Sequence, residues 1–251
     1  MNREDLEMGE GRTAEEKLIC GLEHWGMQLS TQQLEQLHQY YENLVRWNAV
    51  MNLTAITEEA DVYEKHFLDS LSISEILNDL SAVRRVIDVG TGAGFPGLVL
   101  AIAFPAWQVT LMDSLNKRIR FLEDTAALLK LENVRCIHAR AEELGHDRKE
   151  REQYDLAVSR AVANLSVLSE YCLPFVKSGG SFVAYKSEKA QEEMDALGRV
   201  PEILGAGRPK VREFELPGTA YHRAFVILPK KKPTPAKYPR KAGLPAKEPL
   251  H

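Results

Sequence analysis

A glycine-rich stretch at residues 90–97, GTGAGFPG, constrains the fold of this chain more than any other segment. It follows the β-branched run VIDV (86–89) and precedes the apolar run LVLAIAF (98–104), so the pattern predicts a turn between a strand and a helix. Glycine has no Cβ and can adopt positive φ, which lets such a turn bring backbone N–H groups close to a ligand. The motif therefore predicts a nucleotide or nucleoside site at the carboxyl end of a parallel strand.

From residue 85 onward, short β-branched runs alternate with amphipathic segments, which is typical of a parallel sheet with crossover helices. Strands are predicted at 86–89, 108–113, 133–138, 154–159 and 180–186, with a final pair at 211–217 and 223–229. Helices are predicted at 98–104, 115–130, 164–177 and about 188–199. Residues 140–152 are too charged for a core and predict a loop with one helical turn. The pattern favours a Rossmann-like α/β fold, with a mostly parallel seven-stranded sheet and helices on both faces.

The first part of the chain predicts helices instead of strands. A Thr or Ser is followed three positions later by Glu or Gln at 13–16 and at 30–33, so capping boxes predict helices from residues 14 and 31. A third helix is expected after Thr57, where acidic residues suit the positive end of the helix dipole. The expected organisation is a helical cap at 1–80, a ligand-binding α/β domain at 81–229 and a tail at 230–251.

Charge is distributed very unevenly along the chain. Residues 229–251 contain seven Lys or Arg against one acid, about +6, so the remainder carries about −10 of the formal net charge of −4. This segment also contains six of the twelve prolines, and we expect it to be extended and mobile until an anion orders it. One interpretation is a solubilising terminus, and the other is an arm that contacts RNA phosphates. The candidate RNA contacts are Lys230, Lys231, Lys232, Lys237, Arg240 and Lys241.

Other features exclude several classes of protein. No run approaches the roughly 18 apolar residues of a membrane span, and the first stretch is too acidic for a signal peptide, which favours the cytoplasm. Cys20, Cys136 and Cys172 are far apart and odd in number, with no CxxC pair and no histidine at ligand spacing. The sequence indicates neither a disulfide framework nor a metal site.

Two acidic residues refine the choice of ligand. Asp88 lies two residues before a GxGxG loop, where a carboxylate would repel a phosphate but could accept hydrogen bonds from an ammonium group. Asp113 ends the second predicted strand, 23 residues after Gly90, where a carboxylate is expected to bind a ribose diol. S-adenosylmethionine carries both groups, and NAD fits less well. The candidates in this part of the site are Asp88, Gly90, Thr91, Gly92, Gly94 and Asp113.

Four stretches together resemble the bacterial RsmG (GidB) family of ribosomal RNA small-subunit methyltransferases. They are WNAVMNLTAIT (47–57), HFLDSL (66–71), IDVGTGAGFPGLVLA (87–101) and YPRKAGLPAKEPL (238–250), and RAEE (140–143) and SRAVANL (159–165) match as well. The resemblance implies a class I methyltransferase that uses S-adenosylmethionine to methylate N7 of a guanine, position 527, in the 530 loop of 16S rRNA. It spans nearly everything after about residue 13.

The resemblance also implies roles for individual residues. It implies that Gly90 and Phe95 contact the cofactor, that Asp113 meets its adenosine, that Ala141 and Glu142 flank the adenine, and that Arg160 lies beside cofactor and target. We expect Arg160 to restrain the guanine or its phosphate, with Asn52, His66 and Asp69 as further pocket candidates. For His66 and Asp69, the alternative is an ordinary solvent-exposed position on a helix.

The chemistry of N7 is compatible with the residues that the chain offers. Guanine N7 has an in-plane lone pair at neutral pH, so its methylation needs positioning and no general base. The chain has no Pro-Pro for an amino-nitrogen clamp, and no cysteine in a Pro-Cys or Thr-Cys context for methylation at carbon. A monomer acting on 16S rRNA or the small subunit is the expectation. The alternatives are a methyltransferase for another RNA site or a small molecule, a non-catalytic rRNA-binding assembly factor and, third, an NAD-dependent oxidoreductase.

Overall fold

The structure is a computed structural model that describes residues 11–251 except 78, 83 and 161. The expectation that the chain opens with no signal peptide falls mostly on residues 1–10, outside the described part. Within the described residues, no helix combines the length and the apolar composition that a membrane crossing requires.

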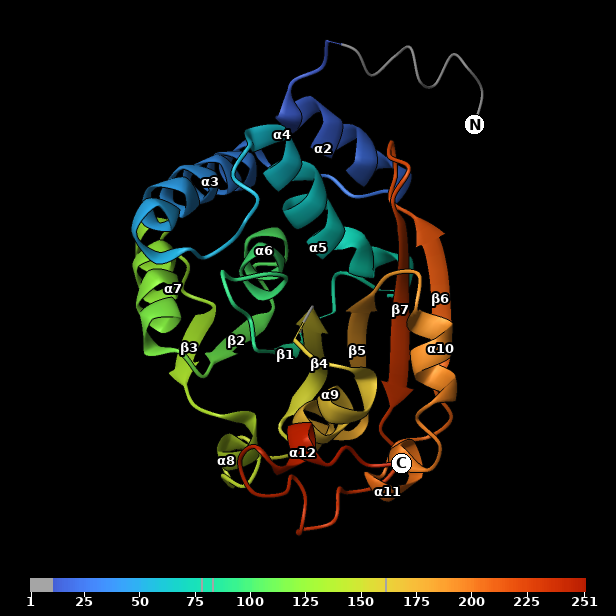
Figure 1. The fold of residues 1–251 in the computed structure, drawn as a ribbon. Helices are drawn as coiled ribbons and strands as arrows, with labels where there is room; N and C mark the ends of the chain where they lie inside the picture. Colours follow the sequence, from blue (N-terminus) through green and yellow to red (C-terminus); the bar gives the residue numbers. More distant parts are fainter. Residues whose placement is uncertain (1–10, 78, 83, 161) are drawn as a thin grey trace.

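A seven-stranded sheet forms the centre of the molecule, in the order β3-β2-β1-β4-β5-β7-β6 (Figure 1). Strands β1 to β5 are parallel, and β7 runs antiparallel to both β5 and β6. The strands are β1 (Arg85–Val89), β2 (Gln108–Asp113), β3 (Val134–His138), β4 (Tyr154–Arg160), β5 (Val176–Lys186), β6 (Lys210–Glu215) and β7 (His222–Pro229). All seven predicted strands are present, so the predicted Rossmann-like architecture is confirmed.

The α-helices of the described chain are α2 (Ala14–His24), α3 (Thr31–Met51), α4 (Glu59–Val62), α5 (Asp69–Leu71), α6 (Gly97–Ala103), α7 (Asn116–Leu128), α8 (Ala141–Leu144), α9 (Leu165–Cys172), α10 (Ala190–Asp195), α11 (Val200–Ile203) and α12 (Leu244–Lys247). Three of them, α3, α7 and α2, have more than ten residues, and the others are shorter. Both predicted capping boxes are formed, with reciprocal hydrogen bonds between Thr13 and Glu16 and between Ser30 and Gln33. Because each box satisfies two N–H groups that a helix leaves without a partner, helix starts were readable from the sequence.

The third predicted helix is not a uniform α-helix. Between α4 and α5 the backbone forms a π-helix, Tyr63–Leu68, and after α5 a 3₁₀ turn, Ser72–Glu75. A π-helical segment inserts an extra residue per turn and is often found at functional sites. It shifts the direction in which His66 and Asp69 leave the backbone, which the 3.6-residue period alone does not predict.

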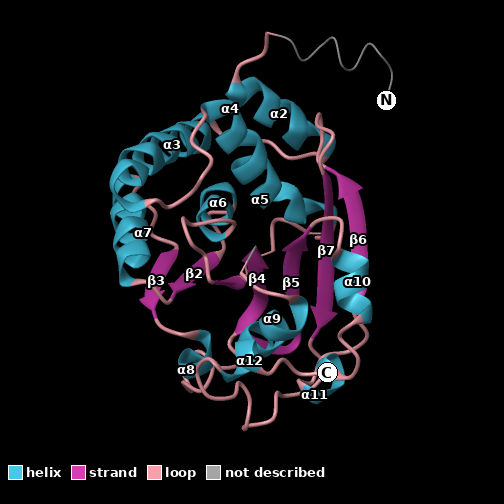
Figure 2. Cartoon of the chain, viewed as in Figure 1, coloured by secondary structure: helices cyan, strands magenta, loops and turns pink. Residues whose placement is uncertain are grey.

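Alternate residues of each strand pack into different layers. Val86, Leu156 and Val158 face the layer that contains α2, α3, α6 and α7, whereas Ile87 and Ala157 face the layer that contains α8 to α11. Figure 2 shows the helices on the two sides of the sheet. The N-terminal helices therefore share one apolar core with the sheet, and the carboxyl ends of the parallel strands are left as the place for a site.

The prediction of a mobile, extended tail is wrong. The Lys230 ammonium is buried and donates to the Leu173 carbonyl (2.6 Å) and to Thr234 Oγ1 (2.6 Å), and Arg240 binds the buried carboxylate of Glu170 (2.7 Å). Lys230 and Arg240 are therefore occupied inside the protein and are not available as RNA contacts. The physical reason is that each charge has an acidic partner, Glu152 at 3.5 Å for Lys230 and Glu170 for Arg240, in addition to carbonyl acceptors, which permits their burial. Lys231, Lys232, Lys237 and Lys241 are exposed.

The charged segment 140–152 also contributes to the interior, contrary to expectation. It contains the predicted helical turn, α8, but Glu142 and Glu150 are both buried. Arg135 forms two hydrogen bonds with the Glu150 carboxylate, at 2.9 and 2.6 Å. Charge density along the sequence did not predict exposure here, because each buried acid has a partner.

Candidate cofactor and substrate site

The glycine loop between β1 and α6 has the conformation that its composition predicts. Gly90, Gly92 and Gly94 all have positive φ, at 75°, 62° and 100°. A Cβ on Gly94 would lie 2.6 Å from the hydroxyl oxygen of Tyr40, whereas a Cβ on Gly92 would meet nothing within 4 Å. Gly94 is thus required by close packing of the cap on the loop. Gly92 borders open space, which is where a ligand can approach the backbone.

Asp88 braces the loop from inside. Its buried carboxylate accepts hydrogen bonds through Oδ2 from Thr91 Oγ1 (2.7 Å) and from the Gly97 N–H (2.8 Å). The other oxygen, Oδ1, has no hydrogen-bond partner among the described residues. Burial is the main cause that raises the pKa of Asp88 to about 6. The carboxylate thus stabilises the conformation of the loop through Oδ2, and Oδ1 is an unused hydrogen-bond acceptor on the buried side of the loop.

Asp113 lies on the same edge, at the end of β2. Its Oδ2 accepts from the Gly92 N–H (3.0 Å) and from Arg118 Nη1 (3.1 Å), and its Oδ1 accepts from the Leu115 N–H (2.8 Å). These bonds fix a carboxylate directly against the glycine loop.

The residues expected to flank an adenine lie further along this edge. Ala141 and Glu142 open α8, which follows β3, and β3 is the strand next to β2. Both residues are buried, and Glu142 Oε1 accepts a hydrogen bond from the Gly243 N–H (2.8 Å). A residue from the tail therefore contacts this part of the site, which the sequence did not suggest.

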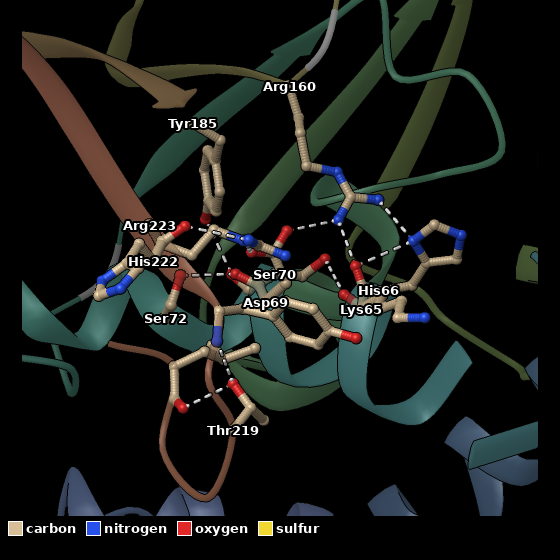
Figure 3. Close-up of polar contacts among 12 residues, drawn as sticks. Lys65, His66, Asp69, Ser70, Ser72, Arg160, Tyr185, Thr219, His222 and Arg223 are labelled. Atoms are coloured by element: carbon tan, nitrogen blue, oxygen red, sulfur yellow. Dashed lines mark hydrogen bonds and ion pairs between the residues drawn. The ribbon is translucent and has the colours of Figure 1, made fainter. Parts of the chain in front are cut away.

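Arg160, at the end of β4, is the centre of a polar cluster (Figure 3). Its Nη1 donates to Asp69 Oδ2 (2.6 Å) and to the Lys65 carbonyl (3.1 Å). Its guanidinium carbon lies 5.1 Å from the ring centre of Phe95 in the glycine loop. The structure thus brings together the predicted residues Arg160, Asp69 and Phe95, because β4 and the cap meet above the loop.

His66 packs into the same cluster as a neutral ring. It stacks on Phe95 with ring centres 4.3 Å apart, and Arg160 Nη2 lies 3.1 Å from its Nδ1. Nδ1 also lies 3.1 Å from the Lys65 carbonyl, which accepts from Arg160 Nη1 as well, and Nε2 lies 3.1 Å from Thr54 Oγ1. Burial, followed by the charge of Arg160, lowers the pKa of His66 to about 4. The ring is therefore uncharged at neutral pH and packs between Phe95 and Arg160.

Arg223 is a member of this cluster that sequence reasoning missed. It lies on β7, and its Nε donates to Asp69 Oδ1 (2.6 Å), opposite the bond from Arg160 (Figure 3). Asp69 is only 5% exposed, so two cations from distant strands compensate one buried carboxylate. Nothing in the local pattern HRAFVILP distinguishes Arg223 from a strand-end surface residue. The signal is present only in the fold.

Asn52, expected as a pocket residue, lies instead at the exposed end of α3. It ends α3 as an exposed residue in the left-handed conformation, with φ 49° and ψ 58°, which is a common helix-ending role for asparagine. Thr54, two residues later, reaches His66 and was not singled out by the sequence. The segment was correctly located near the site, but its contact with the cluster comes through Thr54.

The residues at this edge fit an adenosyl cofactor. Gly92 offers open backbone, Asp113 offers a carboxylate beside it, and the apolar side chains of Leu115 and Val162 are each more than 40% exposed around it. Exposed apolar side chains next to a carboxylate suit a ligand with an aromatic base and a ribose. In contrast, no strong phosphate-binding feature accompanies the loop, because Asp88 lies directly behind it.

Solved structures share this architecture. A putative S-adenosyl-L-methionine-dependent methyltransferase of Methanococcus maripaludis has a TM-score of 0.54 at 14% identity, covering 76% of this chain and 92% of its own. A SAM-dependent O-methyltransferase of Thermotoga maritima has a TM-score of 0.52 at 20% identity, covering 75% and 71%. The chain thus has the fold of the class I S-adenosylmethionine-dependent methyltransferases.

The sequence relatives are much closer. The family model of rRNA small subunit methyltransferase G (GidB) matches residues 33–219. Proteins named ribosomal RNA small subunit methyltransferase G are 51% identical in an Exiguobacterium species and 47% identical in Bacillus subtilis. Each alignment covers 94% of this chain, and 99% and 98% of the respective relative. The chain belongs to the rRNA small subunit methyltransferase G family, so the resemblance inferred from its motifs is confirmed.

Proposed function

We propose that this methyltransferase transfers the methyl group of S-adenosylmethionine to N7 of a guanine in 16S rRNA, at position 527 in the 530 loop. The names of its relatives support small-subunit ribosomal RNA as the substrate. We also propose that it acts as a monomer in the cytoplasm, where ribosomal subunits are available. The choice of N7 rests on the chemistry of the cluster around Arg160.

The state of the titratable groups beside Arg160 carries this proposal. Asp69 is bound on both oxygens by arginines at 2.6 Å, and His66 packs beside Arg160 with its pKa lowered to about 4 by burial. Neither group is arranged to remove a proton from a substrate. A substrate atom that must lose a proton before methylation would therefore lack a general base, whereas guanine N7 already has a free lone pair.

The cysteines give no support for methylation at carbon. That reaction uses a thiolate nucleophile, and burial raises the pKa of Cys136 to about 12 and raises that of the fully buried Cys172 as well. Cys20 is exposed on α2, in the outer helical layer. These positions favour direct transfer to a nitrogen lone pair.

The protein's contribution is then binding, orientation and exclusion of water. The bound cofactor supplies an electrophilic methyl group on a positively charged sulfur. Asp113 and the glycine loop would hold the adenosyl part, and Asp88 would keep the loop in shape. Arg160, held rigid by Asp69, would restrain the guanine or its phosphate, because a fixed guanidinium loses little entropy when it binds.

The exposed lysines of the tail remain proposed RNA contacts. Lys231, Lys232, Lys237 and Lys241 are solvent-exposed, so binding through them would weaken as salt increases. Their contribution should be uniform over RNA sequences, because phosphate contacts position a protein without reading bases.

Labelled methyl transfer to ribosomal subunits tests the function directly. Purified protein is incubated with methyl-labelled S-adenosylmethionine and small subunits from a strain that lacks the enzyme, and nuclease mapping locates the label. A single labelled guanine in the 530 loop, methylated at N7, is expected. Label at another base or only on small molecules would support the alternative methyltransferases, and cofactor binding with no transfer would support an assembly factor.

Arg160→Ala tests the proposed role of the cluster. Transfer should fall by roughly a hundredfold or more, the effect of losing orientation, while cofactor affinity changes much less. Arg199→Ala is the matched control, because Arg199 is 78% exposed and pairs only with the exposed Glu202 among the described residues. Equal losses of cofactor binding and transfer in Arg160→Ala would contradict the assignment.

A further inference from the structure

The end of the chain is attached to the helix that flanks the expected adenine position. Gly243 N–H donates to Glu142 Oε1 (2.8 Å), and His146 Nε2, just after α8, donates to the carbonyl of Pro239 (2.7 Å). The fit is close, because a Cβ on Gly145 would lie 2.8 Å from Pro239 Cγ. Figure 1 shows the red end of the chain passing α8 and α9. We call residues 234–250 the C-terminal segment.

Arg151 joins the same two parts of the chain a second time. Its Nη1 donates to the carbonyls of Gly145 (2.7 Å) and Tyr238 (2.9 Å), and its Nη2 donates to the carbonyl of Thr234 (2.7 Å). One guanidinium therefore binds the end of α8 and two points of the C-terminal segment. Tyr238 and Thr234 are themselves buried, so this packing extends into the interior.

Arg240 anchors the C-terminal segment to the other side of the site. Its guanidinium donates hydrogen bonds of 2.7 to 3.1 Å from Nε and Nη2 to both oxygens of Glu170, and its backbone N–H is a third donor at 2.7 Å. Glu170 is 1% exposed and lies on α9, the helix after β4 and Arg160. Nearer the end, Ser166 Oγ donates to the Leu250 carbonyl (2.6 Å). Such a two-oxygen pairing with a guanidinium fixes both distance and direction.

These contacts matter because α8 cannot hold its own position. It has four residues, Ala141–Leu144, which is too short to be stable as an isolated helix. Its placement depends on what it packs against, and on its outer side that is the C-terminal segment. Glu142 and the neighbouring Ala141 are the residues expected beside the adenine.

We propose that the C-terminal segment is part of the cofactor site and that Arg240 and Gly243 position α8 against the adenosyl group, so that the segment sets cofactor affinity. Arg240 acts as a positioning residue through Glu170, and Glu142 connects the segment to the site. This inference rests on the proposed use of α8 for adenine binding. It assigns part of the basic tail to cofactor binding, whereas the composition alone had suggested RNA.

Arg240→Gln tests this role, with Lys247→Gln as the matched control that removes the same charge from an exposed position of the same segment. If α8 is docked for only a tenth to a fifth of the time, the dissociation constant for S-adenosylmethionine rises about five- to tenfold in Arg240→Gln. Titration calorimetry measures this constant. Hydrogen exchange of residues 139–146 in the cofactor-free protein should accelerate in the same variant, and Lys247→Gln should match the wild type in both measurements.

Steady-state kinetics separates this role from general stability or RNA binding. In Arg240→Gln the KM for S-adenosylmethionine should rise, while kcat and the KM for small subunits stay unchanged. If Arg240→Gln unfolds, His146→Ala provides the same test, because it removes only an exposed ring and its hydrogen bond to Pro239. The dissociation constant for S-adenosylmethionine should then rise about two- to threefold.

The outcomes distinguish this inference from the proposed function. Wild-type protein that fails to bind the cofactor would overturn the function itself. Wild-type binding with unchanged affinity and unchanged exchange in Arg240→Gln would overturn only the positioning role. A raised KM for subunits at constant cofactor affinity would overturn it as well, and would return Arg240 to RNA binding.

Discussion

Asp69→Asn is the substitution that most directly tests how the site is held together. In the native protein the carboxylate compensates Arg160 and Arg223, each at 2.6 Å, and its side chain is only 6% exposed. Asparagine keeps the shape but removes the charge, so two cations remain close together without an anion. Removing one partner of a buried ion pair costs roughly 3–5 kcal/mol.

Solvent reduces this cost here. The side chains of Arg160 and Arg223 are 15% and 22% exposed, so water can compensate part of their charge. We therefore expect a loss of about 2–3 kcal/mol in the free energy of unfolding. For a chain of this size, each 1 kcal/mol lowers Tm by roughly 2–4 °C, so the expected decrease is roughly 4–12 °C.

Thermal and urea denaturation monitored by circular dichroism measure this loss. Glu202→Gln is the control, because it breaks the 3.5 Å pair with Arg199, in which both side chains are at least 75% exposed, and it should cost less than about 0.5 kcal/mol. Asp69→Asn combined with Arg223→Met should recover part of the loss, since one uncompensated cation is gone. Equal melting temperatures for Asp69→Asn and Glu202→Gln would refute the reasoning.

Two further outcomes follow from the glycine loop and from His66. Gly94→Ala should destabilise by about 2–4 kcal/mol in urea denaturation, because it combines φ of 100° with a Cβ 2.6 Å from the Tyr40 oxygen. Gly218→Ala, with φ of 73° and nothing within 4 Å, should cost only the roughly 1–2 kcal/mol of strain, and equal effects would contradict the packing argument. Since the pKa of His66 is lowered from 6.5 to about 4, its contribution to stability is complete above pH 6.5 and is lost as pH falls towards 4. Between pH 7 and 4.5 the wild type should therefore lose on the order of 2 kcal/mol more than His66→Gln, and parallel losses would show that the ring is not the cause.

The main architecture was predictable because its signals are local. Strand and helix periods, the two capping boxes and the glycine loop each depend on residues within a few positions of one another. Asp88 and Asp113 were placed at one edge because parallel strands end on the same side of a sheet, and the pairing of β1 with β2 confirms this placement. The motifs HFLDSL and SRAVANL located the two segments that meet at Arg160.

The fate of the tail shows where local reasoning fails. Composition describes how many charges a segment carries, but it does not say whether partners exist for them elsewhere. Lys230 is compensated by Glu152 (3.5 Å) and by the Leu173 carbonyl, and Arg240 by Glu170, 70 positions away in the sequence. A segment that was predicted to be extended and mobile therefore contributes buried residues to the interior.

The sequence by itself determined the α/β fold, the ligand class and the family of this protein, since these follow from periodicity and short motifs. Only the tertiary structure decided that Arg223 shares Asp69 with Arg160 and that Thr54, instead of Asn52, reaches His66. Arg223 and Asp69 are 154 positions apart. The physical reason is that ion pairs and hydrogen bonds depend on distance in space. The residues that flank Arg223 or Asp69 in the sequence therefore do not indicate which distant residue each will bind.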